Sequence, residues 1–484
     1  MESIYDKYEP VIGLEVHAQL STQSKAYSTD SAAYGGAPNT HISPISLGHP
    51  GTLPKPNLKV IEYAVKLGIA VKANIRKRNE YARKNYFYAD LPKGYQITQH
   101  NTPICNGGYI EIKTEDGKDK KIHLTRIHME EDSGKSIHDL DPFYTLIDLN
   151  RAGVPLLEIV SEPEIANSTE AYNYLSEIRK LVRYLEICDG NMEEGSLRCD
   201  ANISVRVKGQ KEFGTKVEVK NINSISNVKR ALEYEIKRQI ELIENGGTIV
   251  QETRNFDAAK GSTTVMRTKE DAHDYRYFTE PDLAPVVLEE SYFEKVKSQL
   301  PALPNELYRK YIHEMGLPEY DAAVLTESKE VAFYFEEILK HSPNAKAASN
   351  WVMGPIKNYL NERALHITEF PLSGAKIAEI IALIDSNTIS FSAASQTLFA
   401  KMLENPMANA GTLAAELNLI QESNTDQLDE WVAQAIAMYP EKVDEYRGGK
   451  KGLIGLFMGE VMKMSKGKAD PKRSNELLRI KLES

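Results

Sequence analysis

The sequence predicts an α+β protein with an antiparallel-sheet domain over residues 1–290, an all-α helical domain over residues 291–420 and a small α-helical tail domain over residues 421–484. Up to about residue 285, short alternating segments are separated by clusters of Gly, Pro and Asn, which is typical of antiparallel sheet. From about residue 289 onward, the apolar residues follow a helical period. A polar stretch over residues 421–426 marks the last boundary. We call the first domain the cradle domain.

Two helices are expected to interrupt the sheet. Their apolar residues recur at steps of three or four, at Leu175, Ile178, Leu181 and Leu185 and again at Val228, Leu232, Ile236 and Ile240. The second helix is expected to end at Asn245, because Gly246 and Gly247 follow it and favour a helix C-terminus.

Composition and charge limit the classes of function. The chain has 484 residues, 41% hydrophobic and 26% charged, with a formal net charge of −10. No apolar run approaches the ~20 residues that span a bilayer, and the start is acidic, so we expect a cytoplasmic protein without a membrane partner. The negative charge argues against RNA binding by bulk electrostatics. The cysteines Cys105, Cys188 and Cys199 are too scattered for a disulfide framework and are expected as reduced core thiols.

Residues 11–20 alternate between apolar and polar side chains, which places Glu15 and His17 on one face of a strand. Same-face neighbours lie about 6.6 Å apart at Cα, so a carboxylate and an imidazole can converge on one cation or one phosphate-bound water. For this strand alone, a solvated outer face is the alternative interpretation.

The same alternation recurs in three further segments. Their polar faces carry Arg126, His128 and Glu130, then Arg198, Asp200 and Asn202, and then Glu218 and Lys220. Short Asp, Asn and His side chains beside Arg suit fixed coordination better than solubility, so the recurrence favours a built site. Carboxylates and imidazole without thiolate suit Mg²⁺ or Mn²⁺ more than Zn²⁺, and the cations suit phosphates escorted by such an ion.

A turn-rich segment over residues 83–96 interleaves cations with aromatic residues, and this composition can stack on a base and hold phosphate. Tyrosines packed in the core are the alternative. No Walker loop or kinase-type glycine loop is present, so nucleotide must be held in another way. No Ser-Lys or Cys-His spacing supports glutamine hydrolysis, which leaves that half-reaction to another chain.

Seven motifs carry a resemblance to a known family. They are GLEVH (13–17), RKNYFY (83–88), EEDSGK (130–135), DLNRAGVPL (148–156), GSLRCDAN (195–202), EVKNINS (218–224) and DYRYF (274–278). In these motifs, and over nearly its full length, the chain resembles the B subunit of aspartyl/glutamyl-tRNA amidotransferase. The resemblance implies a cradle domain that holds metal, ATP and the tRNA acceptor end, then a helical domain and a tail domain.

The resemblance implies an ATP-dependent, glutamine-hydrolysing carbon–nitrogen ligase that is a heterotrimer with an amidase subunit (A) and a small C subunit. This chain would use ATP and Mg²⁺ to phosphorylate the side-chain carboxylate of misacylated Glu-tRNA(Gln), Asp-tRNA(Asn) or both. Ammonia from the partner would then complete Gln-tRNA(Gln) or Asn-tRNA(Asn). A non-catalytic tRNA scaffold and a stand-alone small-molecule ligase are the competing hypotheses.

The family's motifs also imply roles for individual residues. His17, Glu130 and Glu218 are implied as metal ligands, with Glu15 near a second ion. Glu15, His17 and Glu130 are therefore expected to be catalytic. Charge and strand face alone add three cations that are expected to hold phosphate or carboxylate groups, namely Lys84 as a catalytic residue and Arg198 and Lys220 at the ATP.

One segment departs from the family pattern. Some members hold a structural zinc with cysteine pairs that flank the segment equivalent to residues 37–40, where this chain has Ser28, Asp30, Ser43 and Ser46. A four-thiolate zinc site is therefore impossible here, and the loop must be held by packing and its own hydrogen bonds.

The tail is expected to contain a helix with one buried face, because Leu453, Phe457, Val461 and Met464 follow a helical spacing. Lys and Arg outnumber Asp and Glu behind this helix. On composition alone a solvated face would explain the cations. The resemblance instead implies contact with the body of the tRNA, through backbone and shape.

Overall fold

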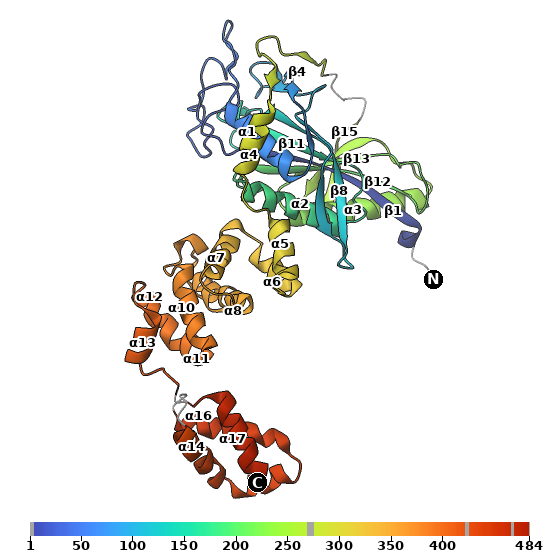
Figure 1. Cartoon of the computed structure of the whole chain (residues 1–484). Coiled ribbons are helices and arrows are strands. Elements are labelled where there is room, and N and C mark those ends of the chain that lie inside the picture. Colours follow the sequence, from blue (N-terminus) through green and yellow to red (C-terminus); the bar gives the residue numbers. More distant parts are fainter. Residues whose placement is uncertain (1–3, 269–274, 422–424, 466–468, 484) are drawn as a thin grey trace. The chain divides into compact units, whose positions relative to one another are not determined.

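The computed structural model describes residues 4–268, 275–421, 425–465 and 469–483. It divides into two compact units, residues 1–303 and 304–484 (Figure 1). The first unit contains the sheet and the second is helical, which confirms the predicted α+β class. The predicted boundaries at residues 290 and 420 stay predictions.

One large sheet organises the first unit. Within the described residues its strands run in the order β15-β14-β13-β12-β1-β11-β8-β6-β2, with β7 paired to β8. All pairs are antiparallel except β13 with β14. The bounds are β1 Tyr8–Gln19, β2 Asn74–Ile75, β6 Cys105–Asn106, β7 Tyr109–Lys113, β8 Asp119–Glu131, β11 Pro155–Ser161, β12 Leu197–Val207, β13 Val217–Ile222, β14 Glu252–Asp257 and β15 Ser262–Thr268.

The two faces of the sheet differ in polarity, as the alternation predicts. Along β1, Leu14, Val16 and Ala18 are buried in the main core, whereas Glu15 and His17 are half-buried on the other face. The same alternation holds along β12 over residues 197–203. Because successive strand residues point to opposite faces, one face can pack on helices while the other carries charge.

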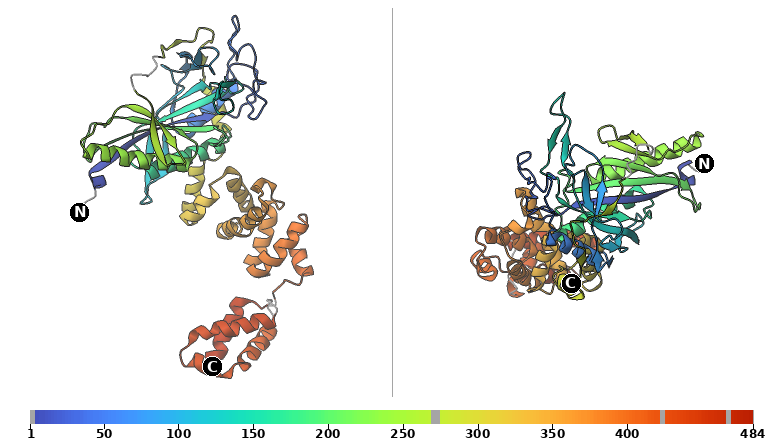
Figure 2. Two further views of the ribbon diagram at one scale, coloured as in Figure 1. Left: turned by 180° about the vertical axis from the view of Figure 1, so that it is seen from behind. Right: turned by 90° about the horizontal axis from the view of Figure 1, so that it is seen from above.

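Three helices cover the apolar face (Figures 1 and 2). They are α1 (Leu58–Ala70), α2 (Ser168–Tyr184) and α3 (Ile225–Glu244). Asn57, Asn167 and Ser224 cap their N-termini by accepting backbone hydrogen bonds. The predicted apolar stripes of α2 and α3 face the core, and α3 ends at Glu244 with Asn245 as its C-cap, which agrees with the predicted helix end.

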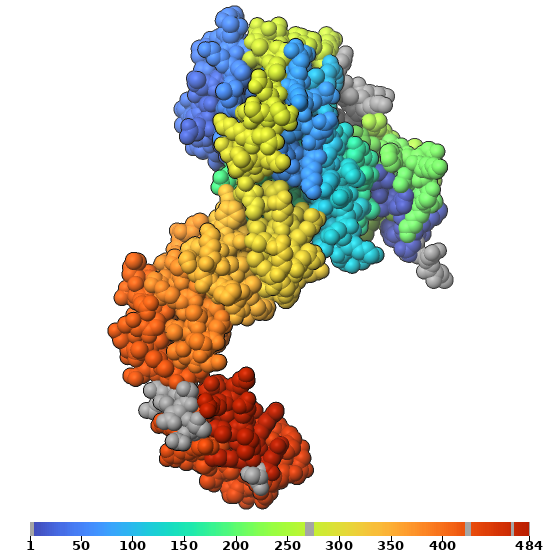
Figure 3. Space-filling view, viewed as in Figure 1, coloured from blue at the N-terminus to red at the C-terminus, as the bar shows by residue number. Residues whose placement is uncertain are grey.

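Smaller elements complete the first unit. Strands β4 (Ala82–Asn85), β5 (Tyr95–Thr98) and β16 (Phe278–Thr279) form one small sheet. Strands β9 (Lys135–Ile137) and β10 (Leu146–Asp148) form a second, and β3 (Arg78–Asn79) and β17 (Val286–Val287) a third. Helix α4 (Glu290–Ser298) packs on α1. In Figure 3 the yellow segment that contains α4 lies at the surface, next to residues coloured blue.

The second unit is helical throughout its described regular structure. Its helices are α5 Pro304–His313, α6 Glu319–Leu325, α7 Lys329–Leu339, α8 Ala345–Trp351, α9 Lys357–Arg363, α10 Gly374–Asp385, α11 Phe391–Ala393, α12 Phe399–Glu404, α13 Ala410–Glu416, α14 Thr425–Ala437, α15 Pro440–Arg447, α16 Ile454–Met464 and α17 Pro471–Glu483. Phe457 and Val461 of α16 are buried in a separate core with α14 and α17, which confirms the predicted buried face of the tail helix.

Cys105, Cys188 and Cys199 are free and buried, as predicted. Burial raises the pKa of the Cys105 and Cys188 thiols to about 12, so both remain protonated. No helix in the described part of the chain is long and apolar enough to cross a bilayer.

Candidate active site

Four neighbouring strands place one row of polar side chains across the sheet. In the antiparallel register, Arg198 on β12 lies opposite His17 on β1, and His17 lies opposite Glu158 on β11. Glu158 in turn lies opposite His128 on β8. Directly opposite residues have Cβ atoms about 4.5–5.5 Å apart, so adjacent side chains in this row are within reach of one another. The row brings together residues that are far apart in the sequence.

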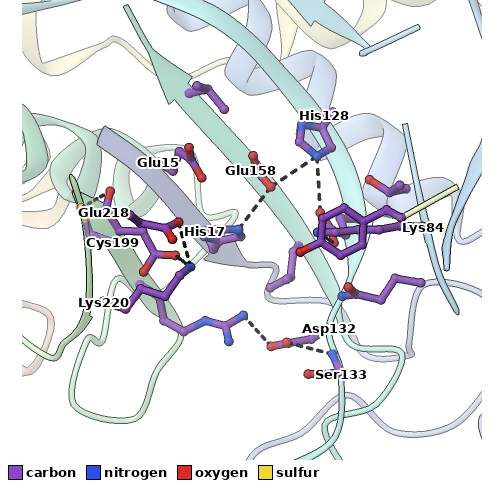
Figure 4. A pocket seen from close by; sticks show the side chains of 18 of the residues that line it. Glu15, His17, Lys84, His128, Asp132, Ser133, Glu158, Cys199, Glu218 and Lys220 are labelled. Atoms are coloured by element: carbon purple, nitrogen blue, oxygen red, sulfur yellow. Dashed lines mark hydrogen bonds and ion pairs between the residues drawn. The ribbon is translucent and has the colours of Figure 1, made fainter. Parts of the chain in front are cut away.

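Glu158 lies between two histidines (Figure 4). Its Oε2 is 3.2 Å from His17 Nε2 and 3.4 Å from His128 Nε2. His128 Nε2 is also 3.4 Å from Oε2 of Glu130. His128, Glu130 and Glu158 are all buried. Among the described residues, these three offer one imidazole nitrogen and two carboxylate oxygens within 4.8 Å of one another.

Neighbouring groups keep the two buried glutamates ionised. Burial alone raises the pKa of Glu158, but the charges of His128 and His17 and the His17 hydrogen bond outweigh it and hold the pKa below its usual range. Burial is likewise outweighed at Glu130, where Lys84 and His128 lower the pKa. Opposite charge thus offsets the desolvation that would otherwise neutralise both groups.

Lys84 on β4 completes this cluster. Its Nζ is 3.3 Å from Oε1 of Glu130, and its side chain is 23% exposed. Burial lowers the pKa of Lys84, but the charge of Glu130 more than compensates and the pKa is raised. Lys84 is therefore a cation that points at the buried carboxylates and keeps access to the cavity.

A second charged group lies on the same face, on β12 and β13. Lys220 Nζ donates to Asp200 and is 3.2 Å from Oε1 of Glu218. Burial would lower the pKa of Lys220, but Asp200 and Glu218 raise it. Glu218 also accepts a hydrogen bond from Thr253 Oγ1 at 2.8 Å. Lys220 is thus held as a cation by two carboxylates.

Glu15 on β1 lies between the two charged groups in sheet order, and Arg198 is on β12, the strand that carries Asp200. Glu15 accepts a hydrogen bond from Asn202 Nδ2 at 2.9 Å. Burial, followed by the charges of Glu158 and Asp200, raises the pKa of Glu15. Arg198 Nη2 donates to Oδ2 of Asp132 at 2.8 Å, and the charge of Asp132 raises the pKa of Arg198.

The charged residues described above all line one cavity of about 760 Å³. Its lining includes every site residue predicted from the sequence, namely Glu15, His17, Lys84, Glu130, Arg198, Glu218 and Lys220. Of the predicted metal ligands, Glu130 belongs to the compact three-residue group and His17 contacts it through Glu158. Glu15 and Glu218 lie elsewhere on the cavity wall, and the predicted ligand set stays a prediction.

Sequence reasoning missed Glu158 and gave His128 no metal role. Glu158 lies in a strand that reads PLLEIVS and is almost wholly buried, so it lacks the alternation that identified the other strands. The available signal was a single carboxylate inside a buried apolar run, which is unusual unless the charge has a partner. His128 was on the predicted polar face, and only the strand order shows that it meets Glu158.

The cluster of His128, Glu130 and Glu158 fits a divalent cation. It offers two ionised carboxylates and one imidazole, all buried, with donor atoms close enough to share one ion. Hard oxygen ligands with a single nitrogen suit Mg²⁺ or Mn²⁺. Nε2 is the ring nitrogen of His128 that faces the carboxylates, and the buried Nδ1 has no hydrogen-bond partner among the described residues.

The loop that departs from the family pattern is held without metal-binding thiolates. Oδ2 of Asp30 accepts hydrogen bonds from Ser28 Oγ and Ser43 Oγ, both at 2.9 Å, and from Ser46 Oγ. The buried Lys25 ammonium adds a second tie by donating to the backbone carbonyl of His41 at 2.6 Å. These bonds confirm that the loop's own hydrogen bonds take part in holding it.

Comparison with known proteins places this site in a family. Residues 10–294 match the model described as "GatB/GatE catalytic domain", and residues 333–482 match the model described as "GatB domain". The chain belongs to this family. The first match contains every residue of the cavity described above.

Curated members of the family resemble this chain over nearly its full length. The B subunit of aspartyl/glutamyl-tRNA(Asn/Gln) amidotransferase from Syntrophotalea carbinolica is 49% identical over 476 residues, which cover 98% of this chain and 99% of that protein. Proteins of the same name from Caldicellulosiruptor bescii and Nitrosococcus oceani are 48% identical over 480 residues and 49% identical over 477. They cover 99% and 98% of this chain, and 99% and 100% of those relatives. The resemblance predicted from the motifs is confirmed.

Proposed function

We propose that this family member, the B subunit of a tRNA-dependent amidotransferase, uses ATP and Mg²⁺ to phosphorylate the side-chain carboxylate of misacylated Glu-tRNA(Gln), Asp-tRNA(Asn) or both. One observation carries the proposal. A buried, ionised group of two carboxylates and an imidazole adjoins Lys84, in a cavity that also holds Arg198 and Lys220. Phosphoryl transfer requires this combination of a site for a divalent cation and side chains that hold phosphate.

The reaction needs two displacements. An oxygen of the side-chain carboxylate attacks the γ-phosphorus of ATP, the bond from that phosphorus to the β,γ-bridging oxygen breaks, and ADP leaves. Ammonia then attacks the acyl carbon and loses a proton, and phosphate departs with the carboxylate oxygen that bonded to phosphorus. The first step is required because a carboxylate oxygen is a poor leaving group until it carries a phosphate.

The residues of the cavity divide this work. His128, Glu130 and Glu158 would hold a divalent cation, with His17 hydrogen-bonded to Glu158 so that its carboxylate keeps a fixed orientation. When bound, such an ion spreads the negative charge of the phosphates. Lys84, between Glu130 and the cavity, is placed to hold a phosphate oxygen during transfer.

Arg198 and Lys220 lie on the far side of His17 and Glu15 in sheet order, where they would bind the phosphates or the substrate carboxylate. Both already have carboxylate partners, Asp132 and Asp200, which fix their orientation before a substrate arrives. Fixed charges stabilise a transition state better than charges that must first reorient.

The names of the relatives support the partners that this reaction needs. A protein named as a B subunit has partner subunits, and the sequence offers no arrangement for glutamine hydrolysis. We propose that an amidase subunit (A) supplies ammonia, that a small C subunit completes a heterotrimeric ligase, and that the tail domain contacts the tRNA. Work on aminoacyl-tRNA would place the complex in the cytoplasm.

The experiment uses the full chain purified with its partner subunits, and native mass spectrometry should first show two of them. With misacylated tRNA, ATP and glutamine, Glu130→Ala should abolish ATP cleavage while tRNA binding stays unchanged. Asp119→Ala, at the exposed end of the same strand, is the control and should behave as the unaltered protein. ATP cleavage retained by Glu130→Ala would favour a non-catalytic scaffold, and ATP turnover without tRNA or partners would favour a stand-alone ligase.

A further inference from the structure

Four aromatic side chains gather on one wall of the cavity. They are Tyr86, His100, Tyr275 and Tyr277, which come from two separate regions of the chain, and we call them the aromatic wall. Single exposed aromatic residues are common on protein surfaces, but four that line one charged cavity are not explained by chance exposure.

The rings of the wall are arranged as a stacking platform. His100 and Tyr277 are stacked face to face, with ring centroids 4.0 Å apart and an interplanar angle of 6°. Tyr86 meets Tyr275 edge-on at 5.9 Å, and Tyr275 lies 6.0 Å from Tyr277. Tyr277 is 37% exposed, so the wall is not a buried core cluster. The parallel pair already has the geometry that a further flat ring would extend.

Hydrogen bonds from Asn85 fix the wall in place. Asn85 on β4 donates from its backbone N–H to the carbonyl oxygen of Tyr275 at 2.9 Å. Its side-chain amide donates to the carbonyl oxygen of Arg276, also at 2.9 Å. The strand β16 that follows pairs with β4 at Phe278 and Arg83. Tyr86 and Tyr277 directly flank strands β4 and β16 of the small sheet that carries Lys84, so this sheet sets the position of the wall relative to the charged cluster.

Lys84 joins the wall to the charged cluster. Its ammonium lies 5.2 Å from the ring centroid of Tyr275 and 3.3 Å from Oε1 of Glu130. The cavity thus has an aromatic side and a charged side, with a cation between them. A ligand that suits both sides has a flat aromatic group joined to an anionic group, and a nucleotide has this composition.

We propose that the aromatic wall stacks on an adenine ring while the adjoining phosphates lie toward Lys84. The inference rests on the proposed function, because that function brings two adenine-bearing substrates to the cavity. One is ATP, and the other is the 3′-terminal adenosine of the tRNA that carries the misacylated residue. The shared chemistry is a purine ring beside phosphate, and binding measurements can distinguish the two sources.

The test variant is Tyr277→Leu, which removes an exposed ring from the wall and leaves a side chain of moderate size. Tyr277→Phe keeps the ring and loses only the hydroxyl. Phe87→Leu is the matched control, because Phe87 is 93% exposed, directly follows Tyr86 and does not line the cavity. The substituted positions are exposed, so folding should be retained, and thermal unfolding of each complex checks this.

Each variant is measured with four probes, namely Mg·ATP, Mg·tripolyphosphate, intact tRNA and the same tRNA without its terminal adenosine. Stacking of one base on an aromatic ring is worth ~1–3 kcal/mol, so Tyr277→Leu should weaken binding of the adenine-bearing probe by roughly 5- to 150-fold. Tripolyphosphate and the shortened tRNA lack that adenine, and their binding should not change. Tyr277→Phe and Phe87→Leu should stay within about twofold of the unaltered complex.

The outcomes separate this inference from the proposed function. A loss confined to Mg·ATP identifies the nucleotide as the ligand of the wall, and a loss confined to intact tRNA identifies the terminal adenosine. If the unaltered complex cleaves ATP but Tyr277→Leu binds all four probes as Phe87→Leu does, the aromatic wall is overturned and the proposed function stands. If the unaltered complex binds tRNA through the wall but never cleaves ATP, the proposed function is overturned and the aromatic wall stands.

Discussion

Replacing Glu158 with glutamine tests whether a residue inside an apolar strand is central to the site. Glu158→Gln keeps the shape of the side chain and removes its charge. Oε2 of Glu158 contacts His17 Nε2 at 3.2 Å and His128 Nε2 at 3.4 Å, in a residue that is only 8% exposed. We expect loss of activity without loss of the fold, because the amide can still accept a hydrogen bond from one of the two histidines.

The size of the effect follows from these two contacts. A hydrogen bond to a charged group contributes about 1.5–3 kcal/mol. If one of the two contacts survives with the amide, the loss is about 1.5–3 kcal/mol, which corresponds to a fall of roughly 10- to 150-fold in kcat/KM. Loss of one of three cation ligands acts in the same direction, so this range is a lower bound.

A surface pair of the same chemistry provides the control. Oε2 of Glu164 lies 2.9 Å from Nδ1 of His123, which is closer than either contact of Glu158, but the two side chains are 40% and 54% exposed. Exposed pairs are worth about 0–1 kcal/mol, so Glu164→Gln should change kcat/KM by less than about fivefold. Both variants lose the charge of a glutamate that contacts a histidine. They differ in the burial of that glutamate and in whether it lines the cavity.

The assay measures ATP-dependent amide formation on misacylated tRNA by the purified complex, with Mn²⁺ binding followed by electron paramagnetic resonance. Glu158→Gln should lose both activity and tight Mn²⁺ binding, while Glu164→Gln should keep both. If Glu158→Gln retains activity within a few-fold of Glu164→Gln, the cluster of His128, Glu130 and Glu158 is not the cation site, and the reasoning from burial and geometry fails.

Three further predictions concern other parts of the first unit. Lys84→Met should lower amide formation by about 100-fold or more and leave tRNA binding within twofold. The reason is that breaking a buried ion pair costs about 3–5 kcal/mol and leaves Glu130 without this cation. Unchanged amide formation would exclude a role for Lys84. Asp30→Ala should lower the free energy of unfolding by about 2–4 kcal/mol in denaturant titrations, since three serine hydroxyls lose their acceptor. The difference in unfolding free energy between the unaltered protein and Asp30→Ala should be the same with and without a chelator, and a difference that disappears with the chelator would show that a metal holds the loop. Burial lowers the pKa of Lys25 to about 8, below the ~10.4 of an unfolded lysine, so between pH 8 and 10.4 the unfolded chain binds more protons and stability should rise with pH. The free energy of unfolding of the unaltered protein minus that of Lys25→Met should therefore increase across this window by at most about 3 kcal/mol, and a flat or falling difference would contradict the burial argument.

The polar faces of single strands could be predicted because strand alternation is local. Glu15 and His17 share a face whatever the rest of the chain does, since side chains in a strand alternate with a period of two. The helix stripes at Leu175 and Val228 are local in the same way. These features needed no knowledge of how the strands pair.

The strand order could not be predicted, and it decides which charges meet. Strand β1 lies between β11 and β12, which follow it by well over a hundred residues. Only this pairing sets His17 opposite Glu158 and Glu158 opposite His128. A long-range register depends on core packing across the whole sheet, so Glu158 had no local signal that would join it to the site.

The hydrogen bonds of Asp30 show a similar limit. The absence of cysteine pairs around residues 37–40 excluded thiolate zinc, but sequence alone could not show that three serines share one carboxylate oxygen. The side chains of Ser28 and Ser46 are 18 residues apart and meet only because the loop folds back. The sequence shows that serines and an aspartate replace the cysteine pairs, but only the structure shows that these serines bind the aspartate.

The most direct test of the proposed function follows the oxygen atom of the substrate. Misacylated tRNA is prepared with ¹⁸O in the side-chain carboxylate of its glutamyl or aspartyl residue and is converted by the complex with ATP and glutamine. If the carboxylate attacks the γ-phosphorus, one ¹⁸O atom must leave with each inorganic phosphate, and mass spectrometry should find it there. Inorganic phosphate free of ¹⁸O, with amide formed at the normal rate, would contradict the proposal.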